Sequence, residues 1–252
     1  MLKKYYSILS IFFALLFIVS CSEDKTTEPT INESELAIQY LEANGDYVNT
    51  ALPALVAASE LKTLVETGKA YVIDLRAAAD YQKGYIKGAK NVALADIITH
   101  LNTVDFSKYD KIVFVCYSGQ TAGFATALMR FYYADEPAKR DKIFDLKFGM
   151  SSWHSDFATK WQSAISNKYA SQFVTTAAAK PAKGTLPTLT TGKKTGKEIV
   201  QARVEALLKE GFGPASISAD GMFADLTKYY IANYWTEAQY LNPGHVPGAY
   251  QY

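Results

Sequence analysis

The chain has 252 residues, of which 49% are hydrophobic, 13% aromatic and 20% charged. This apolar content supports a globular core and excludes a chain that is disordered throughout. The 26 basic and 25 acidic side chains leave a net charge of +1, without a broad positive field for a phosphate backbone. We therefore expect no nucleic-acid partner. The length allows one large domain, or one complete domain and part of a second.

The amino terminus has the pattern of an export signal. Lys3 and Lys4 precede an apolar run over residues 8–19, which is short for a membrane-spanning helix. The run ends at Ile18-Val19-Ser20-Cys21, which resembles the bacterial lipobox, whose cysteine becomes the lipidated first residue of the mature protein. The alternative is an ordinary cleaved signal peptide, in which Cys21 has no role.

The resemblance to lipoproteins implies lipid attachment at Cys21 and a location in the bacterial cell envelope. Ser22 at the next position favours the outer membrane. Residues 1–21 are thus predicted to be a lipoprotein signal peptide with its lipobox. The polar residues 22–34, which show no apolar periodicity, are predicted to be a tether.

Residues 35–170 alternate between helical and strand patterns. The expected helices cover residues 35–41, 59–68, 94–101, 122–130 and 151–161, and the expected strands cover residues 70–75, 112–115 and 142–146. Buried apolar strands that alternate with helices are typical of an α/β fold, with a mainly parallel sheet and helices on both faces. Ligands of such sheets bind beyond the carboxyl ends of the strands.

Cys116 lies at such an end, directly after the strand predicted over residues 112–115. The chain has only 2 cysteines, so lipidation of Cys21 would leave Cys116 as a free thiol in an exported protein. A free cysteine in this position is either a small buried hydrophobe or a reactive thiol.

The loop that follows favours the reactive thiol. It consists of six residues, Cys116, Tyr117, Ser118, Gly119, Gln120 and Thr121. Gly119 permits an unusual turn, and Thr121 is predicted to cap the following helix. The backbone N–H groups of such a loop and the start of the helix stabilise a thiolate, which is the nucleophilic form of cysteine.

Three motifs in order resemble the rhodanese family of sulfurtransferases. The family's D-x-R…[ED]-[FY]-x-x-G-H-I-x-G-A-x-N signature is similar to the segment from Asp74 to Asn91, with Tyr85 in place of the histidine. The C-x-x-G-x-[RT] loop is similar to Cys116–Thr121. The L-x-G-G-x-x-x-W segment is similar to Leu146–Trp153, with Phe148 in place of its first glycine. Three motifs in the right order are specific where one would be weak.

Asp74 and Arg76 lie two residues apart at the end of a predicted strand, so both side chains face the same side. We expect them to be structural support that fixes loops by hydrogen bonding. The alternative is that Arg76 polarises a substrate anion.

The resemblance implies a rhodanese-type sulfurtransferase that needs no cofactor. In such an enzyme, Cys116 would take sulfur from a small anion such as thiosulfate, hold it as a persulfide and pass it to a thiol or to cyanide. A carrier that differs only in its physiological acceptor has the same features. The alternatives are a non-catalytic binding module and a phosphatase. The phosphatase is disfavoured because it needs an arginine six positions after the cysteine, where this chain has Ala122.

The remainder of the chain is predicted to hold a linker and a second repeat. Residues 171–198 are rich in Thr, Lys, Gly and Pro, which indicates a linker. Within residues 199–252, the segment 230–249 resembles residues 74–89, with Asn233 and Trp235 in the places of Asp74 and Arg76. The repeat is incomplete, so we expect either a fragment of a longer tandem protein or a tail that packs on the first domain, and we favour the fragment. The three histidines lack metal-ligand spacing, and no metal is expected.

Overall fold

The computed structural model describes residues 32–45 and 53–252. The predicted signal peptide, Cys21 and most of the predicted tether lie outside the described residues, so their roles stay predictions. Within the described ranges, no helix is both long enough and apolar enough to cross a membrane.

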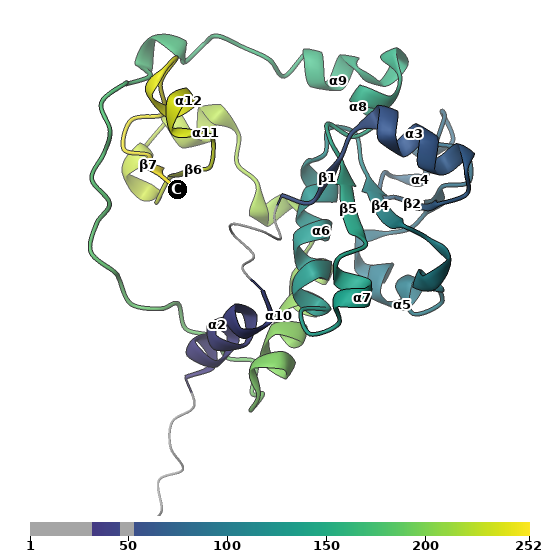
Figure 1. Cartoon of the computed structure of the whole chain (residues 1–252). Coiled ribbons are helices and arrows are strands. Elements are labelled where there is room, and N and C mark those ends of the chain that lie inside the picture. The colour runs from purple at the N-terminus through teal and green to yellow at the C-terminus, as the bar shows by residue number, and fades with distance from the viewer. Residues whose placement is uncertain (1–31, 46–52) are drawn as a thin grey trace, which may run out of the picture. The chain divides into compact units, whose positions relative to one another are not determined.

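A five-stranded parallel sheet forms the centre of the fold (Figure 1). Its strand order is β1-β5-β4-β2-β3, and β4 pairs with β2 on one side and β5 on the other. The strands are β1 (Leu55–Val56), β2 (Ala70–Asp74), β3 (Lys90–Asn91), β4 (Lys111–Val115) and β5 (Ile143–Leu146). The expected parallel α/β architecture is thereby confirmed.

Alternate residues of the strands point to the two faces of the sheet, and each face has its own apolar core. One face carries Ile73, Phe114 and Ile143, which pack with helices α5 (Ile97–Leu101) and α6 (Gln120–Tyr132). The opposite face carries residues such as Val72 and Val113, which pack with α3 (Ala58–Glu66) and α8 (Met150–Trp153). Helices therefore cover both faces, as parallel strands require.

Two expected helices differ from those observed. The helix predicted over residues 94–101 starts as a 3₁₀ turn at Leu94–Asp96 before α5. The helix predicted over residues 151–161 is three short pieces: α8, a 3₁₀ turn at Ser155–Phe157 and α9 (Thr159–Gln162). The break after α8 arises because His154 has extended backbone angles, with φ of −149° and ψ of 141°. Its side chain instead caps the next turn by accepting from the Asp156 N–H. Two further helices of 4 residues, α4 (Ala78–Tyr81) and α7 (Pro137–Arg140), follow β2 and α6.

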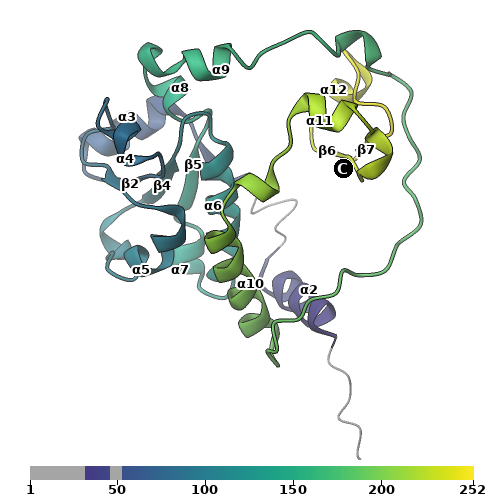
Figure 2. The ribbon, with the colours of Figure 1, turned by 180° about the vertical axis from the view of Figure 1, so that it is seen from behind.

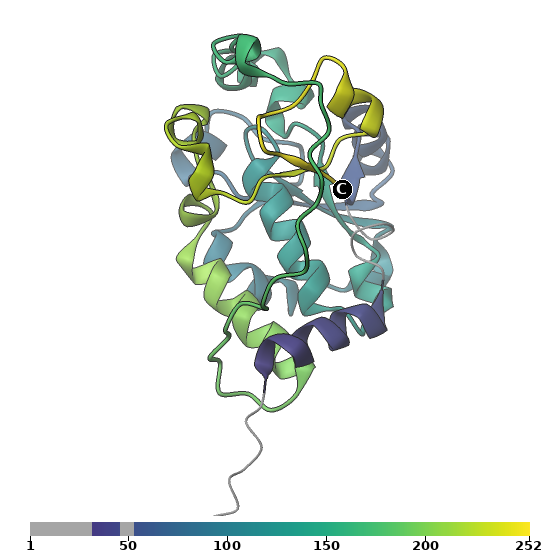
Figure 3. The ribbon, with the colours of Figure 1, turned by 90° about the vertical axis from the view of Figure 1, so that its left-hand side faces the viewer.

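A helix from the distant part of the sequence completes the α6 face. Helix α10 (Gly196–Glu210) lies beside α6 and also packs against α2 (Glu33–Asn44), as Figures 2 and 3 show. Its apolar side chains belong to the same core as α6: Ile199, Val200, Val204 and Leu208. The boundary predicted between residues 198 and 199 therefore falls inside α10. The helix begins earlier because the side chain of Thr195 accepts from the Glu198 N–H and caps its first turn.

The last part of the chain repeats a connection found in the main sheet. Strands β6 (Ala232–Asn233) and β7 (Tyr250–Gln251) pair in parallel on either side of α12 (Glu237–Leu241), as β2 and β3 do on either side of α4. Helix α11 (Ala219–Phe223) precedes this unit.

Side-chain contacts in the two units also correspond. The Tyr240 hydroxyl donates to the Ala249 carbonyl at 2.7 Å, and the Tyr81 hydroxyl donates to the Ala89 carbonyl at 2.7 Å. The ring of Tyr240 stacks on His245 at a centroid distance of 3.4 Å, and Tyr81 stacks on Tyr85 at 4.2 Å. The segment that resembles residues 74–89 in sequence thus repeats these two contacts.

Candidate cysteine site

Cys116 follows β4 directly and begins the turn that leads into α6. Gly119 is the N-cap of α6 and has φ of 90°, a left-handed conformation that glycine adopts without steric cost. This geometry directs the Gly119 N–H to the Cys116 Sγ at 3.2 Å. The first helical hydrogen bond, from the Gly123 N–H to the Gly119 carbonyl at 2.7 Å, fixes the same turn.

The prediction that Thr121 caps the helix is wrong. Helix α6 begins at Gln120 and has no side-chain cap, so Thr121 lies inside its first turn. The absence of a capping side chain leaves the first N–H groups of α6 to the sulfur and to whatever binds beside it. Tyr117, Ser118 and Thr121 are half-buried and Gln120 is exposed, so the outer side of the loop is accessible.

The sulfur itself is in a largely apolar environment. Cys116 is 6% exposed and packs in the same core as Phe114 and Ala122. Each of the two alternatives for a free cysteine therefore has one observation in its favour. The burial of Cys116 favours a small hydrophobe, and the hydrogen bond from the Gly119 N–H favours a stabilised thiolate. A buried thiol does not by itself require a hydrogen-bond donor at its sulfur, because a thiol is a weak acceptor.

A second loop, which follows β5, supports the cysteine loop from behind. The Met150 N–H donates to the Cys116 carbonyl at 2.8 Å, and the Ser151 N–H donates to the Tyr117 carbonyl at 2.9 Å. Gly149 lies between the two backbones. A Cβ at this position would meet the Cys116 carbonyl oxygen, and it would lie 2.9 Å from the Gly119 nitrogen. Only glycine therefore fits there.

Phe148 stands where the rhodanese pattern has its first glycine, and its backbone keeps a glycine-like conformation. Its φ is 62°, and it is the one non-glycine residue with positive φ among the described residues. Its ring lies on the surface near Trp161, with a centroid distance of 5.9 Å. The departure from the pattern therefore keeps the positive φ that favours a glycine at this position.

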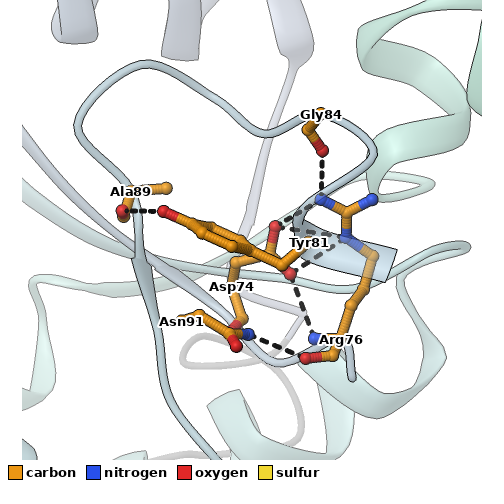
Figure 4. Close-up of polar contacts among 6 residues, drawn as sticks. All are labelled: Asp74, Arg76, Tyr81, Gly84, Ala89 and Asn91. Atoms are coloured by element: carbon orange, nitrogen blue, oxygen red, sulfur yellow. Dashed lines mark hydrogen bonds and ion pairs between the residues drawn. The ribbon is translucent and has the colours of Figure 1, made fainter. Parts of the chain in front are cut away.

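Asp74 and Arg76 form a buried ion pair beside the site, with a shortest distance of 2.7 Å between Arg76 Nη2 and Asp74 Oδ2 (Figure 4). The same nitrogen donates to the Gly84 carbonyl at 2.7 Å, and Asn91 Nδ2 donates to the Arg76 carbonyl at 2.7 Å. Burial opposes the charge of Arg76, but the hydrogen bonds and charge of Asp74 outweigh it and raise the pKa of Arg76. The pair fixes the end of β2 to the loop that leads to β3.

The guanidinium of Arg76 also packs against the rings that border the cysteine loop. Its Cζ lies 5.3 Å from the centroid of Tyr117 and 5.1 Å from that of Phe157. Arg76 therefore contributes positive charge next to Tyr117, as well as the hydrogen bonds that hold the loop.

A surface cavity of about 460 Å³ opens beside Tyr117. Partial burial raises the pKa of Tyr117, with a further increase from the Asp80 carboxylate, so the phenol stays neutral at neutral pH. Lys160 Nζ lies 4.3 Å from the centroid of the Tyr117 ring. The cavity is lined by Asp80, Lys83, Tyr117, Asp156, Phe157, Thr159 and Lys160. A larger hollow of about 740 Å³ lies beside the start of β2 and contains none of the predicted site residues.

Asp145 is a buried residue near the loop that sequence reasoning missed. It is 4% exposed, and burial raises the pKa of its carboxyl group to about 8. The available signal was its place in the strand Ile143–Leu146, where it shares a face with Ile143. A carboxyl group in an apolar strand is rarely buried without a role or a partner.

The arrangement suits a nucleophile that carries negative charge, because the Gly119 N–H donates to the sulfur at the N-terminus of α6. In residues 32–45 and 53–252, no group of three His, Cys, Asp or Glu side chains is placed to hold a metal ion.

A match to a protein-family model agrees with this architecture. Residues 57–156 match the family model for the rhodanese-like domain. Similar solved structures include a rhodanese-related protein from Thermoplasma volcanium, with 17% identity, a TM-score of 0.34, and coverage of 41% of this chain and 92% of that one. A rhodanese-like domain protein from Staphylococcus aureus has 20% identity, a TM-score of 0.32, and coverage of 40% and 91%.

No curated protein matches the chain. The family match covers strands β2 to β5, the cysteine loop and the Gly149 loop, but not β1. The chain therefore contains a rhodanese-like domain, with the α/β fold of that family.

Proposed function

We propose that this domain is a rhodanese-type sulfurtransferase in which Cys116 carries sulfane sulfur as a persulfide. The observation that supports this most strongly is the Gly119 N–H directed at the Cys116 Sγ at 3.2 Å, at the start of a 13-residue helix without a side-chain cap. Such a donor stabilises a sulfur anion, and the same environment serves a thiolate and a persulfide alike.

The reaction has two steps that balance in atoms and electrons. The Cys116 thiolate attacks the outer sulfur of thiosulfate, an S–S bond forms to Cys116, and the S–S bond of thiosulfate breaks to release sulfite. A thiolate or cyanide then attacks the outer sulfur of the persulfide, which releases the Cys116 thiolate with a new persulfide or thiocyanate. Negative charge stays at the loop in every state, so its N–H groups contribute throughout.

The alternative is a non-catalytic module that binds a partner through the same surface. Rhodanese-like domains include both classes, and the low exposure of Cys116, 6%, is the observation that favours the module. A binding module needs neither a donor at the sulfur nor an open first turn of α6. We therefore favour the enzyme.

The two functions are separated by the rate of thiocyanate formation from thiosulfate and cyanide. We expect Cys116→Ser to reduce this rate to that of protein-free buffer while the circular dichroism spectrum is unchanged. Cys21→Ser is the matched control, because it makes the same substitution at the only other cysteine and should keep the wild-type rate. A wild-type rate equal to that of Cys116→Ser, in folded protein, would support the binding module instead.

We also propose that the protein is anchored by lipid at Cys21 in the bacterial cell envelope, in the outer membrane. The support for this is the order of charge, apolar run and small residue before that cysteine. A second proposal is that the segment 230–249, within the residues 199–252 predicted as a repeat, belongs to the start of a second rhodanese-like repeat. The matched contacts of Tyr81 and Tyr240 support it.

A further inference from the structure

Asp145 is a buried carboxyl group that the proposed sulfur transfer does not use. It lies on β5, is 4% exposed, and its Oδ1 has no hydrogen-bond partner in the described part of the chain. A buried polar atom without a partner costs free energy, so its retention requires an explanation.

The other oxygen of this carboxyl group lies against the first turn of α6. A Cβ built on Gly119 would be 3.5 Å from Asp145 Oδ2, and a Cβ built on Gly123 would also be 3.5 Å from it. The carboxyl group therefore occupies the space that the two glycines leave on the sheet side of the helix. Gly119 is the residue whose N–H donates to the Cys116 Sγ.

No opposite charge compensates Asp145 within the described ranges. The strand residues paired with it are Phe114 on β4 and Leu55 on β1, both apolar. On α6, the charged side chain is Arg130, whose Nη1 donates to the Ile143 carbonyl at 3.0 Å, two residues back along the strand. Cys116 and Tyr117 are the titratable side chains of the loop that leads into this end of the helix.

We infer that Asp145 is a positioning residue for Cys116. While its own carboxyl group is protonated, Asp145 leaves the start of α6 free to stabilise the negative charge of the sulfur. In the neutral state, it fills the space beside Gly119 and adds no charge. In the ionised state, its negative charge competes with the sulfur anion and repels an anionic donor such as thiosulfate. The inference rests on the proposed function for its biological meaning but not for its test.

The physical basis is that one helix N-terminus cannot fully stabilise two anions in the same buried region. Burial raises the pKa of Asp145 to about 8, so the group is neutral at neutral pH and ionises in mildly alkaline solution. Tyr117 does not ionise in that range, because its pKa is raised.

The test compares alkylation of Cys116 by iodoacetate, an anion, and by iodoacetamide, which is neutral. The rate constant for iodoacetate divided by the rate constant for iodoacetamide reports the electrostatic potential at the sulfur, since the fraction of thiolate cancels in this ratio. Between pH 7 and pH 9 we expect this ratio to fall in the wild-type protein, on the order of tenfold. We expect it to stay constant in Asp145→Asn, which is neutral at every pH.

Asp110→Asn is the matched control. It removes one carboxylate from the exposed turn before β4, at the opposite end of that strand from Cys116. Its alkylation ratio should fall between pH 7 and pH 9 as that of the wild-type protein does. Equal ratios for the wild-type protein and Asp145→Asn across the pH range would overturn the inference.

A measurement on the wild-type protein alone covers the case in which Asp145→Asn does not fold. Carbon-13 NMR of protein labelled at aspartate carboxyl carbons should contain one resonance that titrates near pH 8. A spectrum in which every aspartate titrates below pH 6 would also overturn the inference. Both measurements work without any sulfur transfer, so a failure of the proposed function leaves them interpretable.

Discussion

Gly149→Ala is the substitution that most sharply tests how the cysteine loop is held. Gly149 has φ of 55°, and its Cα lies against the backbone of the Cys116 loop. A Cβ there would meet the Cys116 carbonyl oxygen and would lie 2.8 Å from the Tyr117 carbonyl carbon. Because these neighbours are backbone atoms, the strain can be relieved only by a shift of the loop itself.

The expected cost has two parts. With φ of 55° and ψ of −148°, Gly149 has a backbone conformation that is essentially restricted to glycine and costs an alanine about 1–3 kcal/mol, part of which is offset because alanine has fewer unfolded conformations than glycine. The steric overlap adds about 1–3 kcal/mol, as for other overpacked interiors. We therefore expect the free energy of unfolding to fall by about 2–4 kcal/mol. The shifted loop should also turn the Gly119 N–H away from the sulfur and reduce sulfur transfer.

Gly68→Ala separates the two parts. Gly68 has φ of 68° and no atom within 4 Å of an added Cβ, so only the conformational cost applies there. Urea denaturation should give a loss of about 1 kcal/mol or less for Gly68→Ala. The thiocyanate rate of this control should equal that of the wild type. If Gly149→Ala were as stable as Gly68→Ala and equally active, the contact between the two loops would not determine the site.

Three further changes test other parts of the structure. Arg76→Ala leaves the buried Asp74 carboxylate without its partner, and urea denaturation should show a loss of about 3–5 kcal/mol; a loss under about 1 kcal/mol would refute the structural role. Asp145 binds a proton in the folded protein at pH values where the unfolded chain has released it, so its burial lowers stability progressively from about pH 4 to pH 8. Asp145→Asn should remove this fall in stability, so the difference in urea midpoint between the variant and the wild-type protein should grow from about pH 4 to pH 8. A difference that stays constant over this range would contradict the raised pKa of Asp145. Cys21→Ser should move the protein from the membrane fraction to the soluble fraction of bacterial cells, and an unchanged distribution would exclude the lipid anchor.

The parts of the fold that follow from local patterns could be predicted from the sequence. The apolar run after Lys111 predicts a buried strand, and the residues after Thr121 predict a helix; β4 and α6 are both present. The position of Cys116 between them follows directly. Hydrophobic periodicity reports burial along one element, which is why these elements were accessible to sequence reasoning.

Features that depend on contacts between distant segments could not be predicted in this way. The start of α6 is set by the left-handed turn at Gly119 rather than by Thr121, because the loop must pass Gly149. The apolar residues of α10 indicate a helix, but they do not indicate that it packs on α6. Asp145 reads as an ordinary strand carboxylate until its environment is known.

The central claim is that Cys116 is a nucleophile whose sulfur anion is stabilised by the start of α6. Its most direct test is mass spectrometry of the protein after incubation with thiosulfate, followed by peptide mapping. We predict that the peptide containing Cys116 gains the mass of one sulfur atom and loses it again on addition of cyanide. A folded wild-type protein whose Cys116 peptide keeps its original mass after thiosulfate would contradict the claim.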